Sequence, residues 1–140
     1  MQRLKLLMLL FVITLMNAAS SQTLKDMNGG VVATIDSIGV VKNSTGDQIG
    51  QFMSNGDVQD GKGDVIGSID EGTFKDINGA TLGTINEQGE VLDVNSMKVG
   101  EVIDAETIKG GDGYVIGTAT SGGDVNQLTA YYFFYFNTQF

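Results

Sequence analysis

The residues that could perform chemistry in this 140-residue chain are its carboxylates. The sequence holds 17 Asp and Glu but no His, Cys, Pro or Trp. Without His or Cys there is no Ser-His or Cys-His nucleophile, no thiol redox couple and no ordinary zinc site. Acid–base catalysis by two carboxylates, as in glycosidases, is the enzymatic chemistry left open. No feature of the sequence marks such a pair, so we expect that the protein is not an enzyme.

The acidic residues recur at regular intervals. Two sets stand out, Asp26, Asp60, Asp76 and Asp93, and Glu71, Glu87 and Asp104. Stacked repeats would turn such sets into rings of oxygen ligands for a hard cation such as Ca²⁺. The alternative is that Asp near turns bonds the local backbone and keeps the protein soluble. We favour this alternative, and expect no metal and no cofactor, because Gly110-Gly111-Asp112-Gly113 matches the calcium nonapeptide repeat only in part.

Residues 1–21 are typical of a cleaved secretory signal peptide. Arg3 and Lys5 give a positive start, residues 6–16 are apolar, and small residues follow before Gln22. The apolar stretch is shorter than the ~20 residues of a membrane span, and no second stretch follows. We expect cleavage just before Gln22, export to the periplasm, cell surface or medium, and a single domain over residues 22–140 without a membrane span.

The predicted mature chain is strongly acidic. Residues 22–140 contain six Lys, no Arg and all 17 acids, which gives a net charge of −11. Such a surface repels nucleic acid and anionic lipid, and it lacks the bidentate phosphate ligand that Arg provides. We therefore exclude nucleic acid as a partner.

The elements that must position these residues come from a repeat of about 17 residues. Its aligned lines begin at Thr23, Val40, Asp57, Thr73, Glu90, Thr107 and Asp124, and the third line is one residue shorter. The second, tenth and thirteenth columns of the alignment are apolar, and the seventh is mostly Gly. The eleventh column reads Ala33, Gly50, Gly67, Gly83, Gly100, Gly117 and Phe134.

Each line is predicted to be one β-hairpin, with strands near columns 1–5 and 8–14. Pairs such as Asn28-Gly29 and Asn78-Gly79 are preferred in tight hairpin loops, where both central residues need positive φ. A second turn ends most lines, at Gly39, Gly56, Gly72, Gly89 and Gly123. The eleventh-column glycine has two alternative explanations. One is a β-bulge at the glycine, and the other is the close approach of another backbone.

Closure of the sheet is the expected outcome. An isolated hairpin is marginal in water, and a chain rich in Gly without Pro protects free strand edges poorly. We therefore predict an all-β, closed, pseudo-symmetric barrel or ring of hairpins. The last line is different, because it lacks the glycines and carries Tyr131, Tyr132, Phe133, Phe134, Tyr135 and Phe136. We predict that it forms a C-terminal strand that caps the core or, if exposed, an interaction surface, and we find no helical periodicity after residue 22.

The pattern resembles the five-fold beta-flower family of small exported bacterial proteins, which have glycine-punctuated hairpin repeats and an aromatic C-terminal strand. The resemblance covers essentially all of residues 22–140. It rests on the units at residues 76–85 and 113–118 and on the aromatic run at residues 131–136. It implies a fold but no activity and no functional residues. A five-fold body would leave the outer two of the seven lines as seams or plugs.

These observations lead to two functional hypotheses. The first is a non-catalytic binding or envelope-associated module, whose ligand meets the loops or the aromatic end. The second is a self-assembling structural protein, in which strand edges or the aromatic end join copies into oligomers or fibres. The sequence identifies neither a ligand nor a partner, and it leaves a homo-oligomer open.

Overall fold

The computed structural model describes residues 21–136. Residues 1–20 of the predicted signal peptide, and Phe140 of the aromatic end, lie outside the described residues. The described chain contains twelve strands followed by two short helical segments. In chain order these are β1 Gln22–Asp26, β2 Val31–Ile35, β3 Val40–Asn43, β4 Gln48–Phe52, β5 Asp57–Asp60, β6 Val65–Asp70, β7 Thr73–Asp76, β8 Thr81–Ile85, β9 Glu90–Asp93, β10 Lys98–Ile103, β11 Thr107–Gly110, β12 Val115–Ala119, α2 Val125–Thr129 and η1 Ala130–Tyr135.

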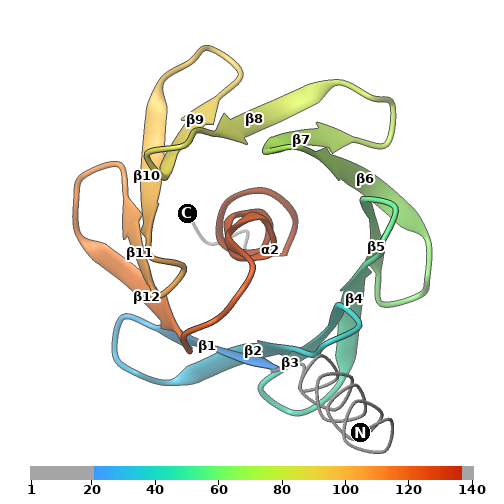
Figure 1. Ribbon diagram of the computed structural model, residues 1–140. Helices are drawn as coiled ribbons and strands as arrows, with labels where there is room; N and C mark the ends of the chain where they lie inside the picture. Colours follow the sequence, from blue (N-terminus) through green and yellow to red (C-terminus); the bar gives the residue numbers. More distant parts are fainter. Residues whose placement is uncertain (1–20, 137–140) are drawn as a thin grey trace, which may run out of the picture.

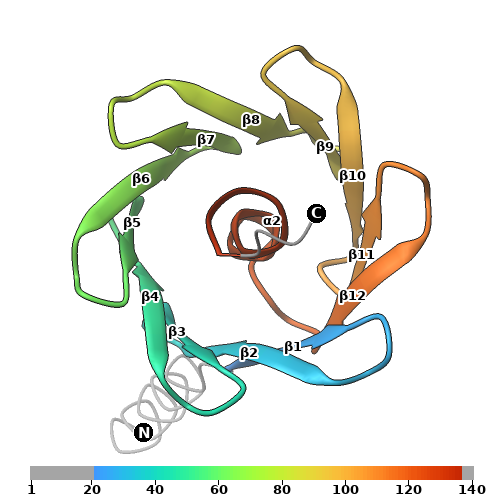
Figure 2. The same cartoon turned by 180° about the vertical axis from the view of Figure 1, so that it is seen from behind.

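The strands form a closed antiparallel barrel in which each strand pairs with its neighbours in sequence. The last strand, β12, pairs with β1 and closes the ring, with Leu24 opposite Ala119. The predicted closed barrel of hairpins is therefore confirmed. The twelve described strands make six hairpins. Figure 1 shows that the loops of the hairpins project outward from the ring, and Figure 2 shows the same ring from behind.

We call the six hairpins petals 1 to 6, from β1–β2 to β11–β12, and the loop inside each hairpin its tip. The first six lines of the repeat form the petals, so the first line is an ordinary member of the ring. The described part of the seventh line, residues 124–136, lies inside the ring (Figure 1). The described ring thus has six petals and one plug.

The tips have a common backbone turn. In petal 1 the N–H of Gly29 donates to the carbonyl of Asp26 at 3.1 Å, and Gly29 has a φ of 82°. Asn28 does not have positive φ, so the predicted tight loop with two central residues at positive φ is wrong. The tip is instead a wider loop that ends in one left-handed residue. Glycine occupies that position in five tips and Ser96, with a φ of 62°, in the fifth petal.

The apolar columns of the repeat face the interior, as their alternation requires. All six second-column side chains of the petals are fully buried, namely Leu24, Val41, Val58, Phe74, Val91 and Ile108. The thirteenth-column side chains pack beside them, some fully and some partly buried. None of the helices in residues 21–136 has the length and apolar character that a membrane crossing requires.

The aromatic C-terminal segment is not a strand. It forms the helical segments α2 and η1, which enter the space enclosed by the ring (Figure 1). The predictions of a C-terminal capping strand and of no helix after residue 22 are therefore wrong. The physical reason is that all ring edges are already paired, so only a segment that satisfies its own backbone can fill the interior.

Candidate functional site

The predicted site residues, Tyr131 to Phe136, lie together at the centre of the barrel. We call residues 125–136 the plug. Tyr131 and Tyr132 are buried, and the four aromatic residues that follow are partly buried against the same core. The segment that the sequence marked as a cap or an interaction surface thus lies inside the ring in the described structure.

The plug begins at an ordinary helix cap. The carboxylate of Asp124 accepts hydrogen bonds from the N–H groups of Asn126 at 2.8 Å and Gln127 at 3.2 Å. This is the standard way to satisfy the free donors of a first helical turn. The chain then widens into a π-helical turn, in which the N–H of Phe136 donates to the carbonyl of Tyr131. The wider turn spreads successive aromatic rings around the axis.

Five aromatic rings of the plug each contact a different petal. A Cβ atom built on Gly117 would lie 2.6 Å from Tyr132, and one on Gly67 would lie 2.6 Å from Tyr135. The same close approach joins Phe133 to Gly100, Phe134 to Gly83 and Phe136 to Gly50. Consecutive residues therefore contact consecutive petals, from petal 6 back to petal 2. We call these glycine positions the seats.

The sixth seat belongs to Ala33 in petal 1, which is fully buried. Petal 1 lies between petal 6 and petal 2 in the ring. The ring of Tyr131 lies between those of Tyr132 and Phe136, at centroid distances of 5.1 and 6.1 Å. From this order we infer that Tyr131 is the ring directed to petal 1, whose seat holds a methyl group, whereas the other five petals each have a close ring contact.

This arrangement decides between the two explanations of the eleventh-column glycine. A bulge is present, because the pairing register shifts by one residue beside the seat in every petal, as between Val41 and Lys42 opposite Ile49, and beside Ala33 in petal 1 as well. However, none of the five seat glycines has positive φ, so the bulge does not itself require Gly. A built Cβ on Gly117 would also lie 2.6 Å from the carbonyl oxygen of Lys25. The close approach of ring and backbone is what excludes a side chain.

Two tyrosine hydroxyls anchor the plug to carbonyl groups of the barrel. Tyr132 donates to the carbonyl of Lys25 at 2.7 Å, and Tyr135 donates to that of Lys75 at 2.7 Å. Burial raises the pKa of Tyr132 far above its usual range, and it raises the pKa of Tyr135 to about 12. Burial also raises the pKa of Tyr131. The hydroxyls of Tyr132 and Tyr135 therefore stay protonated and hold the plug in place.

The fourth-column acids act on their own backbone. The Oδ1 atom of Asp60 accepts the N–H groups of Lys62 at 2.9 Å and Asp64 at 3.0 Å, and the same pair of bonds recurs at Asp26, Asn43, Asp76 and Asp93. The tips that carry them point outward on separate petals (Figure 1).

The fifteenth-column acids lie in the turns between petals, where Glu71 and Asp104 adopt positive φ of 47° and 54°. Within residues 21–136 no three or more acidic side chains come together as a metal-binding group. The fourth-column acids therefore bond the local backbone, which is the alternative that we favoured over a ring of cation ligands.

One tip departs from this scheme. In petal 6 the fourth column is Gly110, and the N–H of Tyr114 is bonded instead by Asp112, at 3.1 Å. The backbone turn is unchanged, because the N–H of Gly113 still donates to the carbonyl of Gly110 at 3.0 Å. The fifth column is also glycine here, Gly111. The tip of petal 6 therefore lacks the fourth-column and fifth-column side chains that most other tips have.

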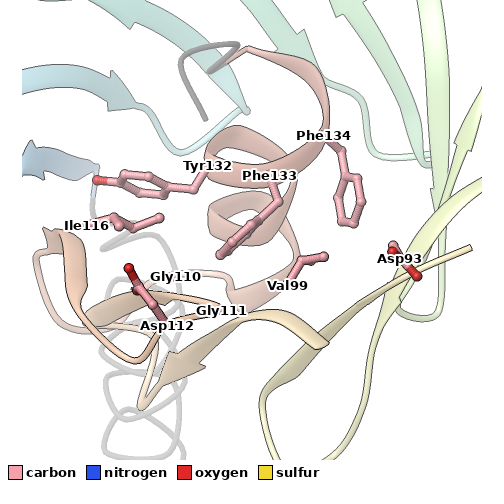
Figure 3. Close-up of a pocket in the computed structure, with 9 residues that line it drawn as sticks. All are labelled: Asp93, Val99, Gly110, Gly111, Asp112, Ile116, Tyr132, Phe133 and Phe134. Carbon is pink, nitrogen blue, oxygen red and sulfur yellow. The ribbon is translucent and has the colours of Figure 1, made fainter. Parts of the chain in front are cut away.

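A pocket lies where these side chains are missing. It has a volume of about 570 Å³ and lies between petals 5 and 6, against the plug. Its lining residues are Asp93, Val99, Gly110, Gly111, Asp112, Ile116, Tyr132, Phe133 and Phe134. Figure 3 shows Phe133 and Val99 between the two aspartates. We call this cavity the petal pocket. Sequence reasoning did not find it, although Gly110 interrupts the fourth-column pattern.

A closed barrel of repeated hairpins around an aromatic helical plug defines a repeat-built all-β protein. The family model of the 5-fold beta-flower protein matches residues 21–137. The chain therefore belongs to the 5-fold beta-flower family. Its described ring has six petals. The comparison with curated proteins gave no match, and neither did the comparison with solved structures.

Proposed function

We propose that this protein is an exported, non-catalytic binding module that holds a small ligand in the petal pocket. The observation that carries the proposal is the coincidence of this pocket with the tip that breaks the repeat. Local departures from a repeat that leave the fold intact are typical of functional positions. The pocket volume of about 570 Å³ lies within the roughly 300–1,000 Å³ of small-molecule sites.

The lining of the pocket supports binding rather than catalysis. Aromatic and aliphatic side chains make most of it, as in other ligand sites. Its two carboxylates, Asp93 and Asp112, each accept hydrogen bonds from the backbone of their own tip. Both carboxylates therefore have a structural role in their own tip.

Export is part of the proposal and is supported by the sequence of residues 1–21. The positive start, the short apolar stretch and the small residues before Gln22 are those of a signal peptide. Gln22 is also the first residue of β1, so cleavage before it would leave the barrel strands complete. Detection of a mature chain that begins at Gln22 outside the cytoplasm, by mass spectrometry, would test this part.

The binding proposal is tested with neutral 3-methylindole. The chain has no Trp, so indole fluorescence reports on the ligand alone. We expect saturable binding with one site per chain. The double substitution Gly110→Asn and Gly111→Val gives the tip of petal 6 the fourth-column Asn of petal 2 and the fifth-column Val of petal 5, and we expect it to abolish binding.

This variant should still fold. The nearest atom to a Cβ built on Gly111 lies at 3.4 Å, and the nearest to one on Gly110 is a side-chain oxygen of the exposed Asp112 at 3.2 Å. An unchanged melting temperature with lost binding supports the proposal. No saturable binding to the wild-type chain, or equal binding to the variant, would contradict it.

Self-assembly into a structural polymer is the second candidate, and it has less support. Among the described strands both edges of the sheet are paired, and the aromatic residues that would join copies lie inside the ring. Some apolar side chains on the tips are exposed, among them Met27, Ile77 and Met97. Light scattering coupled to size exclusion separates the candidates, since a single-chain mass favours binding and a growing polymer favours assembly.

A further inference from the structure

We infer that the petal pocket selects a small organic cation, an ammonium group on an aromatic or aliphatic body. This inference rests on the proposed binding function and adds the chemical class of the ligand. It follows from the charges that face the pocket, from the aromatic floor and from the absence of competing cations in the lining.

The charged lining residues are both acidic. Asp93 is half-buried at the end of β9, and Asp112 is exposed on the tip of petal 6. Figure 3 shows them on opposite sides of the pocket. Each uses Oδ1 for the N–H groups of its own tip, and within residues 21–136 no hydrogen bond to Oδ2 of either is present. One carboxylate oxygen of each residue is therefore left to a ligand.

The floor of the pocket suits a cation as well. The rings of Tyr132, Phe133 and Phe134 contribute to the lining, and aromatic faces attract ammonium groups. An apolar body attached to the ammonium group would rest on Val99 and Ile116. The pocket therefore offers both parts of such a ligand a matching surface.

Among residues 21–136, no lysine lines the pocket, and neither of the ion pairs of Lys98 involves a carboxylate of the lining. The backbone of Lys98 lies beside Gly111, but its Nζ atom is 3.5 Å from Glu90 and 3.6 Å from Glu101. Its charge is thus engaged away from the pocket. The net charge of −11 over residues 22–140 adds a general attraction for cations, which the experiment must separate from the local effect.

Three probes with one ring system separate these contributions: tryptamine, a cation; 3-methylindole, which is neutral; and indole-3-propionate, an anion. We expect tryptamine to bind about tenfold more tightly than 3-methylindole, from one screened charge pair and one cation–π contact. Indole-3-propionate should bind most weakly. The preference for tryptamine should shrink as salt is added.

The matched variants are two double substitutions. Asp93→Asn with Asp112→Asn removes both charges but keeps the Oδ1 acceptors, as Asn43 does in petal 2. It should reduce tryptamine affinity to that of 3-methylindole and leave 3-methylindole unchanged. Asp60→Asn with Asp76→Asn makes the same change in petals 3 and 4, and it should preserve the preference.

The outcomes distinguish the inference from the function on which it rests. If 3-methylindole binds but tryptamine has no advantage, the cation inference is wrong and the binding function stands. The inference is also overturned if the advantage survives in the Asp93/Asp112 variant, or is lost equally in the Asp60/Asp76 variant. If none of the three probes binds the wild-type chain, the proposed function fails together with the inference.

Discussion

At the scale of single residues, the seats are the positions where we expect one added methyl group to lower the stability of the fold most. A methyl group on Gly117 would lie 2.6 Å from both the ring of Tyr132 and the carbonyl oxygen of Lys25. We expect Gly117→Ala to lower the free energy of unfolding by about 2–3 kcal/mol, as overpacking does. Chemical denaturation measures the loss. The control is Gly111→Ala, whose Cβ would make ordinary contacts at 3.4 Å, and an equal loss there would contradict the seat model.

The tyrosine hydroxyls make a second residue-scale prediction. Tyr135 donates to the carbonyls of Lys75 at 2.7 Å and Ser68 at 3.0 Å. We expect Tyr135→Phe to destabilise the protein by about 1–2 kcal/mol, because partly buried carbonyls lose a donor. Tyr114→Phe, on an exposed tip, is the control and should change stability little. Equal melting temperatures for the wild type and Tyr135→Phe would show that the hydroxyl does not anchor the plug.

The same tyrosines predict how stability depends on pH. The pKa of Tyr135 is raised from 10.0 to about 12 in the folded protein. Between these values the unfolded chain has lost a proton that the folded chain keeps, so stability is complete below pH 10 and falls as the pH rises. The slope is at most about 1.4 kcal/mol per pH unit for this residue. Unfolding measured across this range should show a smaller slope for Tyr135→Phe, and an unchanged slope would contradict the assignment.

At the scale of elements, the tip of petal 5 carries a local strain that the others avoid. Ser96 has a φ of 62°, where the other five tips place Gly. The left-handed conformation costs a non-glycine residue about 1–2 kcal/mol. Replacing that residue by glycine removes this cost, but part of the stabilisation is offset because glycine increases the conformational entropy of the unfolded chain. We expect Ser96→Gly to raise the free energy of unfolding by about 0.5–1 kcal/mol in a denaturant titration. The reverse change, Gly79→Ser in petal 4, should lower it, and effects of the same sign would refute the explanation.

The elements also show what the sequence could and could not reveal. The petals were predictable because the second and thirteenth columns are apolar in every line and glycine recurs between them. The plug was predicted as a strand because aromatic residues favour strands in general. Six consecutive aromatic residues, five of which contact five different petals, have no polar face, so they show no helical periodicity. Asp124 was a usable signal, since it is a favourable N-cap.

The pocket was not predicted, for a different reason. Gly110 was compared with a calcium-binding pattern rather than with the fourth column of its own repeat, where the other five petals have Asp or Asn. Only the structure shows that Gly110 and Gly111, which lack the side chains of the other tips, line a pocket together with residues of the plug. The floor of the pocket comes from Phe133 and Phe134, which are distant in sequence from β9 and β10, and no local pattern links them.

At the scale of the whole molecule, the plug and the ring depend on each other. The ring encloses a space lined by seats without side chains, and the plug fills it with aromatic rings. Loss of a single large buried aromatic side chain costs about 3–5 kcal/mol, whereas a domain of this size has about 5–15 kcal/mol in total. A chain that ends at residue 120 should therefore not fold cooperatively, as measured by circular dichroism and calorimetry.

The prediction is tested further by adding the plug back to the truncated chain as a separate peptide. A separate peptide of residues 121–140 carries the cap at Asp124 and all six rings, and it has no covalent tie to β12. The seats of successive petals contact successive aromatic side chains of the plug. We therefore expect one peptide per barrel to restore a cooperative unfolding transition. A peptide of the same composition in scrambled order should not restore it, since its rings cannot match consecutive petals. If the truncated chain unfolds as cooperatively as the full chain, the plug is an accessory to a self-sufficient barrel; if both peptides rescue it equally, the interior selects for apolar bulk and not for the ring-to-petal register.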